Sequence, residues 1–598
     1  MPYFALLDDA LANRAVLFQN HIRSEFLRPE ALDSLDACLK KGWSENLHVV
    51  LFADYEFGLP LQHLPAHTNG HLALHWFSEK HPLSDVQKWL AEHSDEAPAG
   101  LADLQNHTSK TAYTQAISLI KAAIERGDTY QINYTTRLHA QAYGNPIKLY
   151  QRLRQPVPYA ALSCLPDPQR QPIWTLCFSP ECFLKIAENG EIQTEPMKGT
   201  APVLNDGQDE QRALALQADP KNRAENTMIV DLLRNDLGKI ARTGSVRVPE
   251  PFKVSRFGTV WQMTSAVHAQ TCPQTSAADI FRATFPCGSI TGAPKRMSMQ
   301  LINQLETEPR GLYTGSIGHL APCASGLGFH GTLNVVIRTL QLTPSNRSAK
   351  HYHAVYGVGS GIVWDSDSQS EYDECQWKSR FVSRLPPEFG LIETLRVENG
   401  QAPLLADHLS RLSQNARILN IPYNATHIQQ TIQAAIAALP KQPHRLKISL
   451  HPDGSLQHEA APLTNLSAPQ YVTLAETRLP DTDFLRRFKT SQRAVFDRGW
   501  QDAAAAGAFD CLFFNQSGWL LEGGRSNVYL LLDGAYRTPT TDLDILDGIM
   551  RRQVIHHPEL HLGGFPIIES RLTKADLLRA EKILLSNALR GVFEVSLK

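Results

Sequence analysis

The stretch Glu195-Pro196-Met197-Lys198-Gly199-Thr200-Ala201-Pro202 places a lysine beside a glycine and between two prolines. Such a segment cannot be the middle of a helix, so its lysine lies on an extended or turning backbone. Burial or neighbouring cations could destabilise the ammonium there and make Lys198 a nucleophile. Taken alone, the segment favours an ordinary surface lysine, so the rest of the chain has to decide.

The composition is that of an average globular protein. The 598 residues are 42% hydrophobic and 20% charged, which excludes global disorder. Lys plus Arg number 58 and Asp plus Glu number 60, so the formal net charge is −2 and nothing favours nucleic-acid binding. No apolar run approaches the roughly 20 residues that span a bilayer, so we expect no membrane association.

The ends and the cysteines favour a cytoplasmic protein. The N-terminal stretch lacks a basic region and reaches Asp8 and Asp9 at once, which is unlike a secretory signal. The nine cysteines are odd in number and include no C-x-x-C pair, so we expect neither a disulfide framework nor a structural zinc site.

The consecutive prolines at Leu385-Pro386-Pro387 predict the main domain boundary. We therefore expect one domain over residues 1–384 and another over 385–598. Hydrophobic periodicity predicts helices over 113–126, 223–233, 371–382, 406–419 and 428–439. Strands are expected over 130–138 and 173–186 and from residue 389 onward.

Carboxylates in the first region could serve acid catalysis and metal binding. Pro180 fixes the backbone before Glu181, and a carboxylic acid held near an apolar wall can protonate a leaving hydroxyl. Glu225 lies on a predicted helix, and Glu371 and Glu374 share one face of another because they are three residues apart. Carboxylates that converge from separate helices suit Mg²⁺. On spacing alone, solvated acidic faces are the commoner explanation.

Two glycine-rich segments, 287–295 and 357–361, could offer backbone N–H groups to an anion. Neither is a Walker A loop or a G-x-G-x-x-G motif. Each could equally be a tight turn.

Taken in order, these segments resemble the chorismate-utilising enzymes over roughly residues 110–382. The segments that carry the resemblance are Thr129 to Asn133, Ser179 to Glu181, Pro196 to Thr200, Glu225 to Asp236, Gly288 to Lys295, Arg310 to Gly315, Ile337 to Thr339 and Gly359 to Lys378. The resemblance implies an α+β fold, a β-sandwich with helices, for this domain.

Two positions separate the chemistries of this family. Members that add water carry a lysine where this chain has Gln131, and members that use ammonia carry glutamine there. Anthranilate synthases carry alanine where this chain has Lys198. A lysine there resembles the synthases of 4-amino-4-deoxychorismate, which implies that Lys198 attacks C2, expels the C4 hydroxyl and is displaced when ammonia attacks C4.

The resemblance also implies the other roles. Glu181 would protonate the leaving oxygen. Glu225 and Glu374 would hold Mg²⁺, assisted by Glu371. The remaining implied substrate-binding residues are Thr291, Tyr313, Arg338, Gly359, Ser360, Gly361 and Lys378.

Two absences qualify the resemblance. The family usually has histidine where this chain has Gln262, and glutamine cannot titrate. No stretch resembles the Gly-x-Cys-x-Gly elbow of a glutaminase, so the resemblance implies a separate glutamine amidotransferase subunit that delivers ammonia.

The second region contains the residue types that pyridoxal 5′-phosphate (PLP) requires. Lys489 could bind the cofactor covalently, and Glu522 could lie beside its pyridine nitrogen. Arg411 and the backbone of Gly548-Ile549-Met550-Arg551 could bind phosphate. Individually, these residues are more often surface charges or helix starts.

In order, they resemble the fold-type IV PLP enzymes over about residues 388–598, which implies a two-subdomain α+β domain. Ile549, Met550 and Asn587 lie in segments that look more like the 4-amino-4-deoxychorismate lyases than the aminotransferases of this group. The strand pair that usually precedes Phe389 is missing, and the first region could supply part of that edge. The group also makes oligomerisation through this domain conceivable.

The implied product of the first region is the implied substrate of the second. The chain would then convert chorismate and ammonia into 4-aminobenzoate, the aromatic precursor of folate, and pyruvate. One rival is an anthranilate synthase fused to a PLP aminotransferase, which Lys198 disfavours. Another is a synthase with a non-catalytic PLP-fold scaffold, which the presence of Lys489 and Glu522 disfavours.

Overall fold

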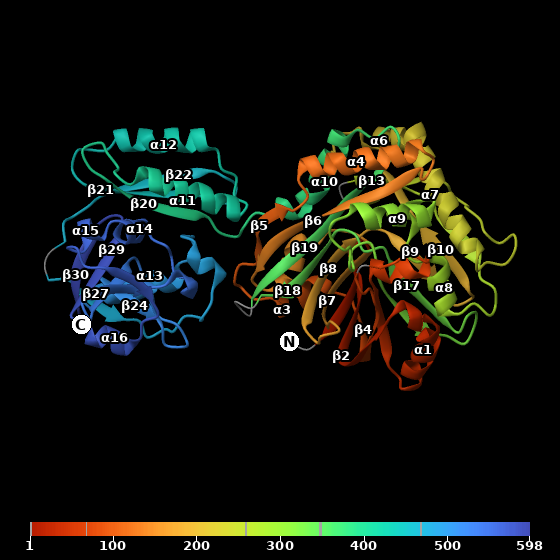
Figure 1. Cartoon of the computed structure of the whole chain (residues 1–598), viewed down its shortest axis with the longest axis horizontal. Helices are drawn as coiled ribbons and strands as arrows, with labels where there is room; N and C mark the ends of the chain where they lie inside the picture. Colours follow the sequence, from red (N-terminus) through yellow and green to blue (C-terminus); the bar gives the residue numbers. More distant parts are fainter. Residues whose placement is uncertain (1–2, 67, 258–259, 346–349, 467–468) are drawn as a thin grey trace. The chain divides into compact units, whose positions relative to one another are not determined.

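The computed structural model describes residues 3–66, 68–257, 260–345, 350–466 and 469–598. The chain divides into two compact units (Figure 1). The first comprises Met1–Ala97, Leu104–Pro344 and Tyr352–Ser383, and the second comprises Pro98–Asp103, Ser345–His351 and Arg384–Lys598. Both units mix helices and strands. The functional division expected at residue 385 stays a prediction.

A large sheet forms the body of the first unit, with strands in the order β14-β10-β9-β17-β16-β3-β4-β2-β1-β7-β8-β18-β19-β6-β15. Strands that are far apart in the sequence are neighbours in this sheet, since β3 pairs with β16 and β1 pairs with β7. The bounds are β1 (Phe4–Asp9), β2 (Arg14–Leu27), β3 (His48–Ala53), β4 (Leu72–Leu83), β6 (Gln131–Tyr143), β7 (Tyr159–Pro166), β8 (Pro172–Ser179), β9 (Cys182–Ile186), β10 (Glu191–Glu195), β14 (Val267–Gln270), β15 (Gly292–Ala293), β16 (Ser316–Pro322), β17 (Phe329–Asn334), β18 (Thr339–Pro344) and β19 (His351–Ile362).

A small antiparallel sheet, β11-β13-β12, carries Lys198. Its strands are β11 (Met197–Pro202), β12 (Lys253–Phe257) and β13 (Val260–Thr264). Helices surround the sheets, and α4 and α10 lie side by side (Figure 1). The helices of this unit are α1 (Leu35–Ser44), α2 (Gly58–Leu61), α3 (Val86–His93), α4 (Lys110–Glu125), α5 (Pro146–Leu153), α6 (Asp209–Ala218), α7 (Pro220–Gly238), α8 (Ala277–Thr284), α9 (Lys295–Leu305) and α10 (Ser368–Ser383).

Two sequence expectations need correction in this unit. The single strand expected over 173–186 is wrong: β8 ends at Ser179 and β9 begins at Cys182. Pro180 lacks an N–H group for a strand ladder, and its position turns Glu181 out of the pairing. The helix expected over 223–233 is longer, because Pro220 occupies its first turn and the Asp219 carboxylate accepts a hydrogen bond from the Asn222 N–H at 2.7 Å.

The second unit contains two sheets, β20-β21-β22 and β25-β24-β23-β30-β29-β26-β27-β28. The strands are β20 (Leu391–Val397), β21 (His444–Leu450), β22 (Leu456–Pro462), β23 (Tyr471–Leu474), β24 (Asp510–Phe514), β25 (Leu520–Gly523), β26 (Asn527–Leu532), β27 (Ala535–Pro539), β28 (Ile567–Ser570), β29 (Lys582–Asn587) and β30 (Gly591–Leu597). The helices are α11 (Leu405–Ile418), α12 (Ala425–Ala437), α13 (Ala494–Ala505), α14 (Ile549–His556), α15 (Pro558–His561) and α16 (Lys574–Arg579).

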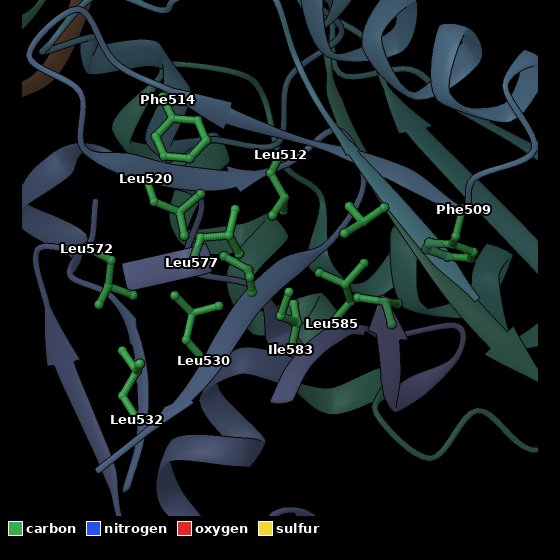
Figure 2. Packing of buried hydrophobic residues seen from close by; sticks show 13 residues of the cluster. Phe509, Leu512, Phe514, Leu520, Leu530, Leu532, Leu572, Leu577, Ile583 and Leu585 are labelled. Atoms are coloured by element: carbon green, nitrogen blue, oxygen red, sulfur yellow. The ribbon is translucent and has the colours of Figure 1, made fainter. Parts of the chain in front are cut away.

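The larger sheet of this unit packs a hydrophobic core (Figure 2). Leu512, Leu530 and Leu585 come from three different strands and are fully buried. Burying one such side chain is worth about 1.5–3 kcal/mol. The core fixes the strands whose ends carry the candidate cofactor-binding residues. No helix among those described combines the length and the apolar surface that crossing a lipid bilayer requires.

Candidate active site

Lys198 lies on β11 and directs its amine toward β6 and β19. A β-carbon added to Gly361 would lie 3.1 Å from Lys198 Nζ and 2.6 Å from Gln131 Nε2. Glycine at position 361 therefore leaves room for both polar groups. Burial lowers the pKa of the Lys198 amine, and the nearby Glu225 carboxylate opposes this effect. The structure thus places a partly desolvated amine beside a glycine of strand β19.

Glu181 is almost fully buried between β8 and β9. The Ser289 hydroxyl donates a hydrogen bond of 2.6 Å to its Oε1 atom. Burial raises the pKa of Glu181 to about 7, so much of this carboxyl carries a proton at neutral pH. Ser289 is a polar contact that the sequence analysis missed, although it lies within the glycine-rich segment 287–295.

The three glutamates expected to bind Mg²⁺ approach one another without forming a compact ligand group. Burial raises the pKa of Glu225, and the negative charges of Glu371 and Glu374 add to the effect. Glu371 accepts a hydrogen bond from Ser366 Oγ at 2.7 Å, and Glu374 pairs with Lys378 at 2.7 Å. The positive charges of Lys198 and Lys221 oppose these effects more strongly than the two glutamates add to them. A divalent cation would further offset the negative charge of the three glutamates.

The glycine-rich segment 357–361 is part of strand β19 and is not the tight turn that the sequence left open. The Lys378 amine donates to the Gly359 carbonyl at 2.9 Å. Ser360 Oγ lies 3.1 Å from the Tyr113 hydroxyl. Thr291 is fully buried, and its hydroxyl donates to the carbonyl oxygens of Cys287 and Gly288. Lys378 also interacts electrostatically with Lys198. The hydrogen bonds of the Thr291 hydroxyl stabilise the turn formed by residues 287–291.

Arg338 and Tyr313 present groups suited to an anion. The Arg338 guanidinium has no hydrogen-bond partner within the described parts of the chain, and burial lowers its pKa. Its φ of 51° is a left-handed conformation that is uncommon for arginine. The Tyr313 ring packs against Gly357, and both Tyr313 and Arg338 interact electrostatically with Tyr356. A partly buried guanidinium without a described hydrogen-bond partner is a candidate partner for a carboxylate.

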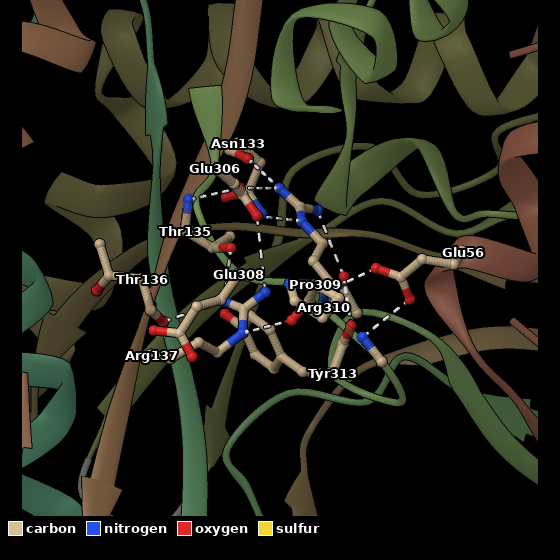
Figure 3. Close-up of polar contacts among 12 residues, drawn as sticks. Glu56, Asn133, Thr135, Thr136, Arg137, Glu306, Glu308, Pro309, Arg310 and Tyr313 are labelled. Atoms are coloured by element: carbon tan, nitrogen blue, oxygen red, sulfur yellow. Dashed lines mark hydrogen bonds and ion pairs between the residues drawn. The ribbon is translucent and has the colours of Figure 1, made fainter. Parts of the chain in front are cut away.

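A buried network of ion pairs and hydrogen bonds surrounds Tyr313 (Figure 3). Arg310 pairs with Glu306 at 2.6 Å and donates to the carbonyl oxygens of Ile290 and Asn133 at 2.8 and 2.6 Å. Arg137 lies over the Tyr313 ring, 5.1 Å from its centroid. One guanidinium thus joins the end of α9, strand β6 and the turn that precedes Thr291.

Replacement of Arg310 by methionine should therefore destabilise the first unit. The side chains of Arg310 and Glu306 are only 1% and 5% exposed, so the variant leaves a buried carboxylate without its main partner. We expect a loss of about 3–5 kcal/mol in the free energy of unfolding, measured by urea denaturation. The control is Arg282→Met, because Arg282 forms an exposed pair with Asp279 that is worth about 0–1 kcal/mol. Equal losses in the two variants would contradict this account.

In the second unit, Lys489 lies next to β20. Its amine lies 3.2 Å from Thr394 Oγ1, and its carbonyl accepts a hydrogen bond from the Ile392 N–H. Burial lowers the pKa of Lys489 to about 7, although the nearby Glu393 carboxylate opposes the shift. A lysine in this state is available as a neutral amine at physiological pH.

Glu522 is buried on β25. The Leu546 N–H donates a hydrogen bond of 3.0 Å to its Oε1 atom. Burial raises the pKa of Glu522 to about 7, and Arg486 and Arg493 partly offset this effect. The carboxyl can therefore share a proton with a basic nitrogen at neutral pH. Arg493 also interacts electrostatically with Lys489, so one cation faces both residues.

Arg411 joins this group to the start of α14. Glu393 holds its Nε and Nη2 atoms at 2.8 and 2.7 Å, while Nη1 reaches the Asp547 carbonyl at 3.3 Å. Ile549 and Met550 begin α14 directly after Asp547 and Gly548, so their N–H groups belong to the first helical turn. A guanidinium and a helix N-terminus together fit a phosphate. The sequence analysis missed Glu393, because only the fold brings it to Arg411.

Asn587 is not tied to these residues by any described hydrogen bond. Its Oδ1 accepts from the N–H groups of Leu589 and Arg590 at 3.1 and 2.9 Å, and its amide donates to the Arg525 carbonyl. These bonds shape the turn between β29 and β30. Gln262, at the usual histidine position, donates to Thr200 Oγ1 across β11 and β13 at 3.4 Å.

Two protein-family models match the chain. The model of the chorismate binding enzyme family matches residues 12–384, and that of amino-transferase class IV matches residues 390–597. The first match begins at residue 12. It therefore includes the segment before residue 110, in which the sequence analysis found no motif. The expected α+β fold class is confirmed for both regions.

Three similar proteins illustrate the first match. Aminodeoxychorismate synthase component 1 of Salmonella typhimurium is 39% identical over 273 residues, 45% of this chain and 56% of that protein. Anthranilate synthase component 1 1 of Haloarcula marismortui is 37% identical over 306 residues, 50% of this chain and 58% of that protein. The crystal structure of DhbC from Bacillus anthracis shares the fold at a TM-score of 0.52 and 17% identity, covering 64% of this chain and 96% of DhbC.

The chain spans somewhat more than half the length of the curated relatives it matches. The family model, in contrast, covers most of the chain and includes every residue of the Lys198 site. The fold and the ordered motifs agree with it. The chain therefore belongs to the chorismate binding enzyme family.

Proposed function

We propose that residues 1–384 aminate chorismate to 4-amino-4-deoxychorismate and that residues 385–598 convert this product into 4-aminobenzoate and pyruvate. The observation that carries the proposal is the desolvated Lys198 amine, which lies beside Gln131 and Gly361 and within electrostatic reach of Glu181. A lysine in a mere structural role would not need a glycine opposite its amine.

The first reaction follows from the protonation states of two residues. Burial favours the neutral amine of Lys198, which attacks C2 of chorismate. Glu181, whose pKa is about 7, donates its proton to the C4 hydroxyl, which leaves as water while both ring double bonds shift. Ammonia then attacks C4, both double bonds shift back and the lysine amine is released. The nitrogen thus reaches C4 by two allylic displacements.

Charged groups of the first unit suit the substrate carboxylates. Arg338, which has no described hydrogen-bond partner, would bind the enolpyruvyl carboxylate together with Tyr313. Glu225, Glu371 and Glu374 would hold Mg²⁺, whose charge would offset theirs and attract the ring carboxylate. Thr291, Lys378 and the β19 residues Gly359, Ser360 and Gly361 would complete the pocket.

The second unit fits PLP, which supplies an electron sink when bound. Lys489 would hold the cofactor covalently, and its amine, once free, would accept the proton from C4 of the substrate. Glu522 would share a proton with the pyridine nitrogen. Arg411 and the N–H groups of Ile549 and Met550 would bind the phosphate, and Asn587 would border the site. Loss of pyruvate would then leave an aromatic ring.

We also propose a source for the ammonia and a compartment for the reaction. Ammonia would come from a separate glutamine amidotransferase subunit, and the protein would act in the cytoplasm. The direct test is incubation of the full chain with chorismate, Mg²⁺, PLP and ammonium, followed by chromatographic identification of all aromatic products. We expect 4-aminobenzoate and an equal amount of pyruvate.

An anthranilate synthase is the second candidate, because the relatives include such an enzyme at 37% identity. It would aminate C2 and give 2-aminobenzoate. Lys198 disfavours it, since ammonia needs no lysine to reach C2 directly. The 2-amino isomer as the main product would overturn the proposal.

The pH dependence of the first reaction should report Glu181. As the pH rises through about 7, this carboxyl loses the proton that it must donate. At a fixed concentration of free NH₃, we expect kcat/KM for chorismate to fall about tenfold per pH unit above this pKa. Glu181→Gln should lose most activity together with this alkaline limb. The exposed Glu188→Gln variant is the control and should keep the wild-type profile. An unchanged profile in Glu181→Gln would assign the acid to another residue.

A further inference from the structure

Imidazole and carboxylate groups gather at a place that neither proposed reaction uses. His107 precedes α4, His139 lies on β6, and Glu308 lies in the turn after α9. Their potential ligand atoms all lie within 4.8 Å of one another, which holds for no other set of three His, Cys, Asp or Glu residues in the described parts of the chain. Imidazole with carboxylate is a ligand set that suits zinc and related ions.

Hydrogen bonds fix how His139 lies in this cluster. Its Nδ1 atom lies 3.2 Å from His353 Nε2, and its Nε2 atom lies 2.8 Å from Glu308 Oε2. One ring nitrogen of His139 thus faces a second imidazole, and the other faces the carboxylate. Metal-binding histidines are commonly oriented in this way, with one nitrogen held by a neighbouring group and the other directed at the ion.

The second imidazole of the cluster, His107, supplies a third potential ligand. His107 Nδ1 lies 3.7 Å from Glu308 Oε1. Ligand atoms about 2.0–2.1 Å from a tetrahedral ion lie roughly 3.3 Å apart, which the observed 2.8 and 3.7 Å bracket. The rings of His107 and His139 are stacked, with centroids 3.9 Å apart. His107 must turn its nitrogen inward, and its side chain, 52% exposed, has room to do so.

We propose that His107, His139 and Glu308 bind one divalent transition-metal ion, such as Zn²⁺. His353 is a positioning residue, because its bond to His139 Nδ1 directs the lone pair of Nε2 at the ion. Three protein ligands leave one position open. His139 and Glu308 also line a cavity of about 320 Å³ that Arg137 and Tyr313 border, so water or a small anion in this cavity could occupy the open position.

The site has a consequence for the turn after α9. Glu308 lies between Glu306 and Arg310, which form the buried network of Figure 3. An ion held between Glu308 and His139 would fasten this turn to β6. The inference does not depend on the proposed amination, since none of the three ligands belongs to the Lys198 site.

The test uses the full-length protein after removal of bound metals. Co²⁺ is added in excess Mg²⁺, which occupies sites made of oxygen ligands alone, and the visible absorption of cobalt reports nitrogen ligation. We expect one equivalent to bind and Zn²⁺ to displace it. His107→Ala and Glu308→Gln should each weaken binding at least about 10–100-fold, and His353→Phe should weaken it by about the same factor while keeping the cobalt spectrum.

The control is His81→Ala, because His81 pairs with Glu79 at 3.2 Å on the surface but belongs to no cluster of three potential metal ligands among the described residues. This variant should bind cobalt as the wild type does. Circular dichroism of each variant shows whether it is folded. The proposal is overturned if the wild type binds no cobalt, or if folded His107→Ala and Glu308→Gln variants bind it as tightly as His81→Ala.

Discussion

Replacement of Lys198 by alanine should lower the rate of 4-amino-4-deoxychorismate formation by about 10²–10⁴-fold with ammonium as the nitrogen source. The variant lacks the amine that attacks C2, so ammonia has no route to C4 by two allylic shifts. The site itself should persist, because the Lys198 side chain makes no described hydrogen bond whose loss would unfold β11. We would measure the aminated product by chromatography and chorismate binding by calorimetry.

A lysine on another strand of the first unit serves as the control. Lys185 is exposed on β9, and Lys185→Ala should retain wild-type rates. Unchanged amination by Lys198→Ala would refute the covalent route. Release of 2-aminobenzoate by this variant would instead show that ammonia can still attack C2, which would support the role of Lys198 in directing nitrogen to C4.

Replacement of Lys489 by alanine should abolish both pyruvate release from 4-amino-4-deoxychorismate and the visible absorbance of lysine-bound PLP. The Lys489 amine is the buried base of the second unit, and its pKa of about 7 leaves it largely neutral as the pH rises above 7. We expect a loss of at least about 10³-fold in the elimination rate, measured with purified aminodeoxychorismate. The first reaction should continue in the same chain.

Lys582 offers a matched comparison in the same unit. It is exposed on β29 and pairs only loosely with Glu594, at 3.5 Å. Lys582→Ala should keep both the absorbance and the elimination. If Lys489→Ala retains the spectrum of lysine-bound PLP, another lysine holds the cofactor. If the wild type shows no such spectrum, the second unit acts without this chemistry.

The sequence predicted what short segments determine. The non-helical backbone at Lys198 followed from its proline and glycine neighbours, and the α+β class followed from the resemblance that the ordered motifs carry. The supporting contacts did not, because they join distant segments. Ser289 reaches Glu181 across 108 positions, and Arg310 reaches Asn133 across 177. No periodicity encodes such pairs.

The same limit applies to the second unit and to the imidazole cluster. Glu393 reads as one polar residue of an alternating strand, and only the packing of α11 on β20 brings it to Arg411. His139 meets Glu308 and His353 across 169 and 214 positions. The roles assigned to Lys198, Lys489 and the other site residues stay predictions that the variants above can test.

The pairing of β3 with β16 has a consequence for synthesis of the chain. His48–Ala53 must wait for Ser316–Pro322 before its edge is covered. At the usual ribosomal speed of about 5–20 residues per second, this delay lasts on the order of 10–50 s. The nascent N-terminal half therefore exposes an apolar strand edge for that time, and it should depend on chaperones more strongly than a chain whose neighbouring strands are made one after another.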